Sequence, residues 1–446
     1  MPKKDNYEIA YVSEDFGIIA ETIIKKNGKT KFAIYQDGKV EFKNQLVLPD
    51  GKIIEPLNES LDVIKSKFIT LPPKPIPYGT EGELFTEVKS FFRKYFSTTK
   101  GFREIVALYI MLTWIYERFN DLPYLRVIGT LGTGKSRFLK TLSACTYNSM
   151  MLGSASVSAI FRTIDKYKGT FILDEANFKN SEYSSEVAKI FNNGNTKDAP
   201  VARMREKANS NGEFTTDFFQ VFGPKILASR ESFGDAAFES RCFAQRLYPN
   251  KNIKVPISLG EEFWKEARIL RGKLLAFRFK HYGSLNIKEL ASEKINNLRI
   301  LQITQPLWNV ALLVGKEVAQ NVIEEAMLMD RDLIADQSDT TEADVLIVIM
   351  RLMDQEGDKI HMKKIAEKHF KSFGRGSQIT EDGLTAIFDY KSDLSERKIG
   401  EIVGKVLHLK KFRDNKGIFI FKDQVTKSAL NNLCERYGIT DDIIYP

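Results

Sequence analysis

The 446-residue sequence contains little cysteine and little histidine, with three residues of the first kind and four of the second. Cys145, Cys242 and Cys434 lie far apart, form no C-x-x-C pair and have no histidine cluster beside them. Zinc sites and disulfide frameworks both depend on such spacings. We therefore expect neither zinc nor disulfides, and the cysteine usage fits a reducing cytoplasm.

Long hydrophobic runs are also absent. The longest one, residues 105–116, is too short to span a bilayer and is followed by Glu117 and Arg118. The first residues, Met-Pro-Lys-Lys-Asp, do not resemble a secretory signal. These features predict a soluble, cytoplasmic protein with no membrane partner.

Acidic charge is in deficit, since 66 Lys and Arg residues outnumber 58 Asp and Glu residues and give a net charge of +8. A positive net charge favours a polyanionic partner such as a nucleic acid. The chain length and its 43% hydrophobic content are sufficient for two or three domains.

The most specific motif that is present covers residues 129–136 and follows the apolar run 124–128 directly. It has the spacing G-x-x-x-x-G-K-[ST], which begins at Gly129 and ends at Ser136. A buried strand, a glycine-rich turn and a helix N-terminus together direct backbone N–H groups at phosphates. The motif therefore predicts a nucleotide-binding loop.

Each side chain of this loop has an expected role. Gly132 and Gly134 let the backbone approach the nucleotide, Lys135 supplies a positive charge, and the Ser136 hydroxyl is a ligand for Mg²⁺. The predicted nucleotide-binding residues of the loop are Gly129, Gly132, Thr133, Gly134, Lys135 and Ser136.

A second motif supplies acidic groups. The apolar run 170–173 ends in Asp174 and Glu175, the composition of a strand that carries a metal-binding carboxylate. We expect Asp174 to hold the metal and Glu175 to polarise the attacking water. Two halves of one site, each preceded by a strand pattern, favour a real nucleotide site over coincidental loops.

The remaining pattern divides the chain into parts. Turn signals at Asn27-Gly28, Asp37-Gly38 and Asp50-Gly51 predict β-hairpins and a small β-rich module over residues 1–75. The proline-rich segment 71–77 predicts a stiff linker.

Helical periodicity over residues 81–96 and 102–119 predicts a helical prefix to the nucleotide domain. Strands and helices then alternate, which indicates an α/β domain with a mainly parallel sheet, and its third strand is predicted at 222–228. The nucleotide domain with its prefix is expected over residues 76–256. Residues 257–338 are expected to form a helical lid that Pro306 interrupts.

Residues 339–446 have the order of a winged helix. Helices are predicted at 342–356, at 362–373 and from Ser395, with a loop over 374–390 and a β-hairpin over 411–421. Between Lys391 and Lys427 there are ten basic and five acidic residues. This face predicts DNA binding, and the alternative is a solvated surface on a protein-interaction module. The candidate DNA contacts here are Arg397, Lys398, Lys405, Lys411, Arg413 and Lys416.

The combined motifs resemble those of AAA+ ATPases, and within them the MCM-like, self-loading replicative helicases of staphylococcal mobile elements and phages. The resemblance covers roughly residues 80–335 and extends loosely to the winged helix. It implies that Lys135 and Ser136 have Walker A roles, that Asp174 and Glu175 have Walker B roles, and that the nucleotide is ATP with Mg²⁺.

The resemblance also implies roles for three further positions. Either Ser229 or Arg230 would be sensor 1, which positions the water at the tip of the next strand. Arg241 would be an arginine finger that reaches a neighbouring subunit, and the alternative is a surface ion pair. Arg299 would be the sensor 2 cation or an ordinary solvated helix residue. A finger acting between chains implies a closed homo-oligomer, which we expect to be a hexamer.

An insertion between the acidic motif and the third strand resembles the pre-sensor 1 hairpin of such helicases. The alternation of Arg203, Arg205 and Lys207 places their side chains on one face of an extended arm. We expect Lys207, near the tip, to contact the DNA backbone, and the alternative is an ordinary hairpin with a basic edge.

The favoured hypothesis is a ring-forming, ATP-dependent replicative helicase that moves on single-stranded and forked DNA. The alternative is an AAA+ initiator, loader or transposition regulator that binds DNA and hydrolyses ATP without unwinding. A non-catalytic, nucleotide-gated scaffold is disfavoured because Glu175 is intact.

Overall fold

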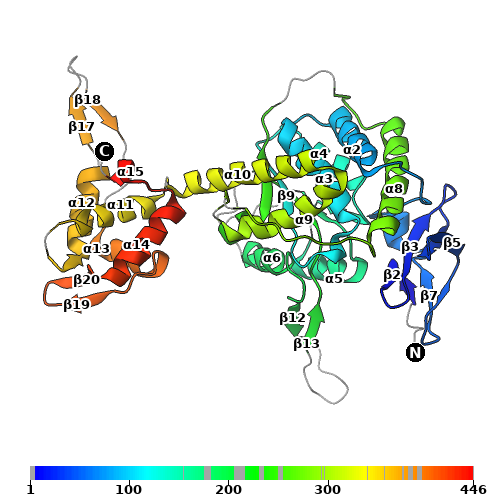
Figure 1. Ribbon diagram of the computed structural model, residues 1–446, viewed down its shortest axis with the longest axis horizontal. Coiled ribbons are helices and arrows are strands. Elements are labelled where there is room, and N and C mark those ends of the chain that lie inside the picture. The colour runs from blue at the N-terminus through cyan, green and yellow to red at the C-terminus, as the bar shows by residue number, and fades with distance from the viewer. Residues whose placement is uncertain are drawn as a thin grey trace. The chain divides into compact units, whose positions relative to one another are not determined.

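Two compact units make up the chain in the computed structural model: unit 1 comprises residues 1–327 and unit 2 residues 328–446 (Figure 1). The structure describes residues 6–153, 155–174, 182–204, 216–230, 236–249, 255–292, 294–295, 297–338, 340–355, 357–373, 376–379, 385–388 and 394–444. The fold is mixed α/β.

An antiparallel sheet of four strands opens unit 1. Its strands, in spatial order, are β2 (Ala10–Ser13), β3 (Ile18–Ile24), β4 (Thr30–Gln36) and β5 (Lys39–Lys43). Gly28 has φ +83° between β3 and β4, and Gly38 has φ +77° between β4 and β5. Glycine adopts these left-handed conformations without steric cost. The first two of the three hairpins that the turn signals predict are therefore confirmed here, and the third is confirmed by the antiparallel pairing of Leu46–Val47 with Ile53–Pro56.

The segment that follows is joined to the rest of unit 1. A small sheet contains β1 (Tyr7–Glu8), β7 (Ile53–Pro56) and β6 (Leu46–Val47), and helix α1 (Asp62–Lys65) follows it. Ile24 N donates a hydrogen bond to Pro72 O at 2.9 Å, and Ile76 N donates one to Gly272 O at 2.9 Å. The prediction that residues 71–77 form a stiff linker between domains is therefore wrong, because hydrogen bonds from this segment join it to β3 and to α8 (Glu261–His281) within unit 1.

A buried charge cluster also holds the N-terminal sheet. Arg278, fully buried, donates from Nε to Glu21 Oε1 at 2.6 Å and from Nη2 to Glu117 Oε1 at 2.8 Å. The Tyr147 hydroxyl donates to Glu21 Oε2 at 2.8 Å. Burial raises the pKa of Glu21 to about 7, against the attraction of Arg278.

The central sheet has six strands. Their spatial order is β15 (Cys242–Arg246), β9 (Tyr124–Ile128), β14 (Lys225–Ser229), β11 (Phe171–Leu173), β10 (Ser149–Leu152) and β8 (Ile69–Thr70). All pairs are parallel except β10 with β8. Parallel strands are covered on both faces, which explains why the predicted strands are continuous apolar runs. The third predicted strand begins later than expected, at Lys225.

Helices surround this sheet. They are α2 (Glu81–Tyr95), α3 (Lys100–Thr113), the short 3₁₀ helix η1 (Tyr116–Arg118), α4 (Lys135–Ser143), α5 (Val157–Tyr167), α6 (Glu182–Asn193) and α7 (Ala236–Glu239). Thr80 and Glu83 form a capping box at the start of α2. Helix α3 is buried along nearly its whole length, which accounts for the longest apolar run. None of the helices in the described residues has the length and apolar character to cross a membrane.

A two-stranded hairpin connects α6 to β14. Its strands, β12 (Val201–Met204) and β13 (Thr216–Phe219), pair antiparallel and project from unit 1 beside α5 and α6 (Figure 1). The Lys225 ammonium, fully buried, donates to Gly194 O at 3.0 Å, Val221 O at 2.8 Å and Gly223 O at 3.0 Å. Lys225 therefore joins the end of α6, the end of the hairpin and the start of β14.

Three helices complete unit 1 and lead into unit 2. They are α8 (Glu261–His281), α9 (Leu298–Val314) and α10 (Lys316–Ser338). The expected interruption at Pro306 is wrong, because Pro306 is buried inside α9. The described residues between α8 and α9 instead form neither helix nor strand, so the break falls at 282–297.

Unit 2 begins with helices and has a small sheet. Its elements are α11 (Thr341–Met353), β16 (Lys359–His361), α12 (Met362–Phe373), β17 (Gly376–Ile379), β18 (Thr385–Phe388), α13 (Glu396–Glu401), the π-helix η2 (Ile402–Val406), β19 (Phe412–Asp414), β20 (Gly417–Phe421), α14 (Gln424–Tyr437) and α15 (Asp441–Ile444). The predicted loop 374–390 is wrong where β17 and β18 pair. The hairpin β19–β20 matches its prediction, and Ser395 caps α13.

Candidate nucleotide-binding site

The phosphate loop lies between β9 and α4. Gly132 has φ +80°, and Gly134, at the N-cap of α4, has φ +91°. A Cβ at Gly129 would lie 2.5 Å from Thr133 Oγ1, so only glycine fits there. The loop therefore presents backbone N–H groups and the positive end of α4 on the same side.

Lys135 holds this loop in shape. Its Nζ donates to Gly129 O at 2.7 Å and to Thr130 O at 2.8 Å, and Thr133 Oγ1 donates to Thr130 O at 2.9 Å. The ammonium thus lies inside the curve of the loop. Phosphate oxygens are stronger acceptors than these carbonyl groups, because a charged acceptor makes a stronger hydrogen bond.

The acidic strand meets the loop. Ser136 Oγ donates to Asp174 Oδ2 at 2.7 Å, although 38 positions separate the two residues. Asp174 follows β11 directly, and its backbone N donates to Leu152 O at 3.0 Å. A hydroxyl and a carboxylate are oxygen ligands of the kind that Mg²⁺ binds, so this pair fits the expected metal. Glu175 lies outside the described residues.

The tip of β14 lies beside the loop because β14 is between β9 and β11. Ser229 is buried, its carbonyl accepts from Gly129 N at 3.1 Å, and its Oγ accepts from Arg126 at 3.0 Å. Arg230, the next residue, is exposed. Both candidates for sensor 1 are therefore at the expected edge, and the Ser229 side chain is held by Arg126.

Arg126 is a functional-site neighbour that sequence reasoning missed. It is fully buried in β9 and donates to both Ser229 Oγ and Glu239, a residue of α7. The available signal was a single cation inside the apolar run 124–128. A buried guanidinium requires such partners.

Arg241 lies at the other end of the sheet. It precedes β15, whose first residue Cys242 pairs with Tyr124 at the start of β9. The five residues of β9 span about 16 Å at about 3.3 Å per residue, so Arg241 lies about that distance along the strand from the phosphate loop. Its Nε donates to Asn195 Oδ1 at 3.0 Å, and its Nη1 donates to Ala237 O. Arg241 therefore does not contact the phosphate loop of its own chain.

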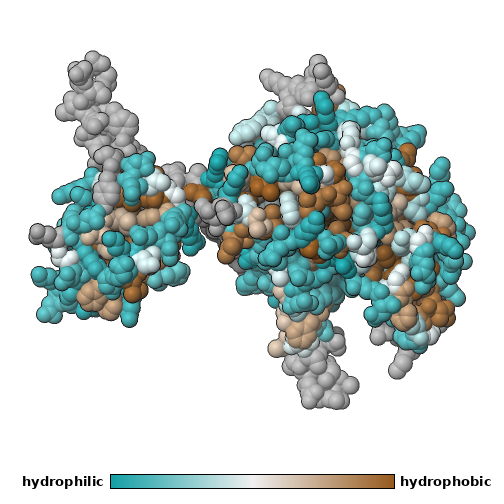
Figure 2. Space-filling model, viewed as in Figure 1, coloured by the Kyte–Doolittle hydropathy of each residue, from teal (hydrophilic) through white to brown (hydrophobic). Residues whose placement is uncertain are grey.

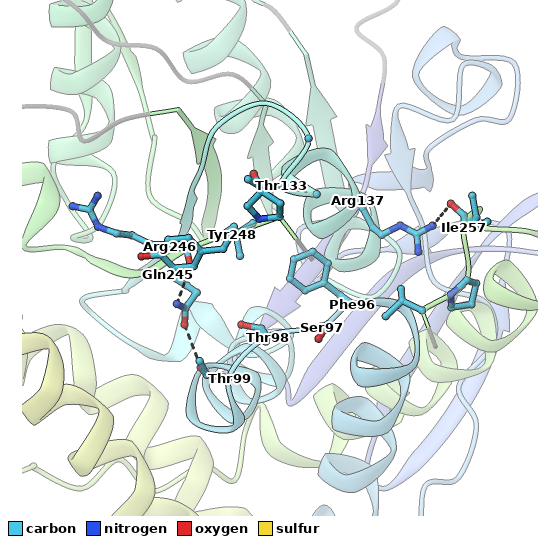
Figure 3. A pocket seen from close by; sticks show the side chains of 16 residues that line it. Phe96, Ser97, Thr98, Thr99, Thr133, Arg137, Gln245, Arg246, Tyr248 and Ile257 are labelled. Atoms are coloured by element: carbon cyan, nitrogen blue, oxygen red, sulfur yellow. Dashed lines mark hydrogen bonds between the residues drawn. The ribbon is translucent and has the colours of Figure 1, made fainter. Parts of the chain in front are cut away.

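A groove of about 840 Å³ borders the loop (Figure 3). Figure 3 shows Phe96, Thr133 and Tyr248 around it. Three other segments line it besides the loop: residues 96–99 after α2, residues 245–249 from the end of β15, and residues 255–257 before α8. Thr99 Oγ1 donates to Gln245 Oε1 at 3.2 Å, and Arg137 Nη2 donates to Ile257 O at 2.6 Å. Its size is within the usual range for ligand sites.

Arg299 lies outside this groove. It is in the first turn of α9, where its Nη1 donates to Gln302 Oε1 at 2.8 Å, and it does not line the groove. Unit 1 gives no contact between Arg299 and the loop among the described residues.

The candidate DNA contacts in the hairpin are only partly described. Arg203 Nη2 pairs with Glu186 Oε2 at 2.7 Å, and its guanidinium lies over the Phe161 ring. Val201 is buried on the same strand face, whereas Met204 is 69% exposed on the other face. Arg203 therefore faces α5 and α6 at the base of the hairpin. Arg205 and Lys207 lie outside the described residues.

The candidate DNA contacts in unit 2 differ in their surroundings. Arg397 and Lys398 are exposed and lie 3.8 Å from Glu401. Lys405, Arg413 and Lys416 are exposed as well. Lys411 is also exposed, but its Nζ donates to Gly400 O at 2.6 Å, so its ammonium group binds the end of α13.

The cysteines are buried and free. Burial raises the pKa of Cys145 to about 12 and that of Cys434 to about 11, which keeps these thiols protonated at neutral pH. Within the described parts of the chain, no group of three His, Cys, Asp or Glu side chains is placed to hold a metal ion.

No family model and no curated protein matches the chain. Among solved structures, the C-terminal region of NrS-1, in its A-form apo structure, is 12% identical with a TM-score of 0.37 over 90% of this chain and 96% of that one. The SCCmec type IV Cch active helicase is 11% identical with a TM-score of 0.35 over 93% and 94%. The JCV helicase is 12% identical with a TM-score of 0.27 over 59% and 64%. The chain is thus distantly similar to solved helicase structures.

Proposed function

We propose that the chain is an ATP-dependent DNA helicase that acts as a ring and moves along single-stranded DNA. The observation that carries the hydrolytic part is the 2.7 Å hydrogen bond between Ser136 and Asp174 beside the Lys135 loop. Three types of group that phosphoryl transfer uses are therefore within one small volume: backbone N–H donors, a lysine cation and two oxygen ligands.

Each residue has a role in this proposal. Lys135 moves from its carbonyl acceptors to phosphate oxygens, and the N–H groups from Gly132 to Ser136 bind the same phosphates. Ser136 and Asp174 would hold Mg²⁺, which would supply positive charge against that of the phosphates. Glu175 accepts a proton from the attacking water. Ser229 or Arg230 positions that water at the tip of β14.

The groove holds the nucleoside. It opens directly from Gly132 and Gly134, and Phe96, Tyr248 and Ile257 supply apolar surface around it. Tyr248 is 74% exposed, so a bound base has an aromatic ring to stack against. Arg137 links this groove to the segment that begins the proposed lid.

The distance of Arg241 from its own loop supports action in a neighbouring subunit. We infer that Arg241 completes the site of the adjacent chain, which makes a closed ring the productive form. Residues 76–256 are then the AAA+ core, residues 257–338 the lid and residues 339–446 a winged-helix DNA-binding domain.

The hairpin β12–β13 is the proposed DNA-moving element. It lies in the chain between α6, which follows the Asp174 segment, and β14, whose last residue Ser229 lies beside the phosphate loop. Lys207 and Arg205 are the proposed backbone contacts, whereas Arg203 anchors the base through Glu186. We further propose that the exposed lysine and arginine side chains of unit 2 bind duplex DNA. We also propose that the helicase takes part in the replication of a mobile element or phage.

The test compares Lys135→Ala with Lys140→Ala, an exposed lysine on the same helix that does not contact the loop. Lys135→Ala is expected to reduce ATP hydrolysis by about 10²-fold or more, because it removes a preorganised phosphate donor. Lys140→Ala is expected to retain activity. Strand separation is measured in parallel on a forked duplex with a fluorescent strand.

The outcomes are distinct. Loss of both ATP hydrolysis and strand separation in Lys135→Ala, with both activities retained in Lys140→Ala, would support the proposed helicase. If DNA stimulates ATP hydrolysis by the unmodified protein but no strands separate, the proposed function would become that of an initiator, loader or transposition regulator. Hydrolysis that survives Lys135→Ala would refute the assigned nucleotide site.

A further inference from the structure

A second groove lies in unit 1, away from the nucleotide site. It has a volume of about 570 Å³ and lies between the N-terminal sheet, the proline-rich segment and α8. Figure 2 shows hydrophobic side chains gathered over the N-terminal strands at this end of unit 1. Grooves of this volume accommodate a few side chains of a bound ligand or peptide.

The floor of this groove is mainly aliphatic. The aliphatic and proline residues that line it are Ile23, Ile24, Pro73, Ile76 and Ile269. Ile269 is 52% exposed and Phe42, at the edge, is 46% exposed. Apolar side chains held open to water in a concave surface favour a partner that covers them.

The rim carries charge of a single sign. The basic residues that line the groove are Lys25, Lys26, Lys31, Lys74 and Arg268, and no acidic residue lines it. Among the described residues, no carboxylate forms an ion pair with any of the four lysines. The local field therefore attracts an anionic partner, and no ion pair within the described part of the chain neutralises the four lysines.

The aliphatic floor distinguishes between two anionic partners. Single-stranded nucleic acid binds basic grooves by stacking its bases on aromatic rings. Phe42 is the only aromatic residue among those that line this groove. Leucine, isoleucine and phenylalanine side chains of a peptide, by contrast, gain from contact with aliphatic groups.

The groove is held rigidly by backbone contacts. Arg268 Nη2 donates to Ile24 O at 2.7 Å, which fixes α8 against the end of β3. The bonds from Ile24 N to Pro72 O and from Ile76 N to Gly272 O fix its remaining wall. A partner therefore binds a preformed surface and orders little of this chain, which lowers the cost of binding.

We propose that this groove docks an acidic segment of another protein, whose large apolar side chains fill the aliphatic floor while its carboxylates meet the lysine rim. The proposal is independent of the nucleotide site and of any helicase activity. It gives the N-terminal part of the chain a function in partner recognition.

The test uses fluorescence anisotropy with the full chain. The probe is a short fluorescein-labelled peptide rich in aspartate that ends in leucine and phenylalanine. Lys25→Glu/Lys26→Glu, which reverses two exposed rim charges, is expected to weaken binding by about tenfold or more, because like charges then face each other. Ile269→Asp, at a half-exposed position that tolerates substitution, is expected to do the same.

A matched control separates rim charge from net charge. Lys39→Glu/Lys52→Glu makes the same charge change at exposed positions of the N-terminal region that do not line the groove. It is expected to bind the acidic peptide within about twofold of the unmodified chain, since exposed charges outside the contact contribute little. A peptide with serine in place of leucine and phenylalanine is expected to bind weakly.

Three results would overturn the proposal. If the Lys39→Glu/Lys52→Glu control loses as much binding as the rim variant, the net charge of the chain explains the effect and the groove does not. Equal binding of the serine peptide would remove the role of the aliphatic floor. A labelled oligothymidylate that loses affinity in the Lys25→Glu/Lys26→Glu and Ile269→Asp variants, while the acidic peptide does not, would make the groove a nucleic-acid surface.

Discussion

At the scale of single residues, Arg278 shows how unit 1 tolerates a cation in its interior. Its guanidinium donates to Glu21, to Glu117 and to Trp114 O, the last at 2.6 Å. Glu21 comes from strand β3 of the N-terminal sheet, whereas Trp114 and Glu117 both come from the short segment after α3. The desolvation of these charges is offset by their pairing, so removal of Arg278 would leave Glu21 buried without its cation, and removal of Glu21 would leave Arg278 with Glu117 as its one carboxylate.

Glu21 makes stability depend on pH. Its pKa is about 7 in the folded protein, whereas an unperturbed glutamate has a pKa of 4.5. Between these two values the folded state binds more protons than the unfolded state, so stability falls as pH rises through this window. Glu21→Gln, which cannot titrate, is expected to flatten this part of the profile. Urea unfolding midpoints measured on both sides of the window test it, and an unchanged slope in the variant would contradict it.

At the scale of elements, β14 connects two regions that the sequence separates. Lys225 at its start binds the carbonyls at the ends of α6 and of the hairpin, and Ser229 at its end lies beside the phosphate loop. Burial lowers the pKa of Lys225 well below its usual value. One strand thus joins the base of the hairpin to the edge of the sheet beside the phosphate loop.

Lys225→Met is therefore expected to loosen this link. It removes three hydrogen bonds and leaves buried carbonyls unsatisfied, which costs about 2–5 kcal/mol of unfolding free energy. Lys189→Met, at an exposed position of α6, is expected to change stability by less than about 0.5 kcal/mol. Denaturant unfolding measures both. The Lys225→Met protein is also expected to lose the stimulation of ATP hydrolysis by DNA. Full stimulation in a folded Lys225→Met protein would show that the connection between the hairpin and β14 is not used.

The strands at 124–128 and 171–173 could be predicted because each is a short apolar run ended by a glycine loop or a carboxylate. The groove beside Gly132 could not, because residues 96–99 and residues 245–249 are far apart in the sequence and come together only in the folded chain, where Thr99 donates to Gln245. The prediction that Pro306 interrupts the helical lid is wrong because it, too, depends on contacts that form only in the folded chain. A proline loses one backbone donor wherever it stands, but burial of α9 against its neighbours outweighs that cost.

At the scale of the whole molecule, the proposed function makes Arg241 act on the site of an adjacent chain. Under that proposal, a ring of Arg241→Ala chains would lack the finger at every site, and a ring of Glu175→Gln chains would lack the base at every site. Mixing the two is expected to restore partial ATP hydrolysis, because some interfaces then combine an intact base with an intact finger. Hydrolysis that stays at the level of the separate variants at every mixing ratio would argue against a shared site.

The buried Arg278 cluster also determines where the chain can be divided. Removal of residues 1–75 would take away Glu21, leave Arg278 with one carboxylate, and strip β8 from the edge strand β10, which exposes unpaired backbone groups. A fragment that lacks residues 1–75 is therefore expected to aggregate. The practical boundary for expression lies near the end of unit 1, and a fragment that starts at the first residue and stops within α10 retains every partner of Arg278.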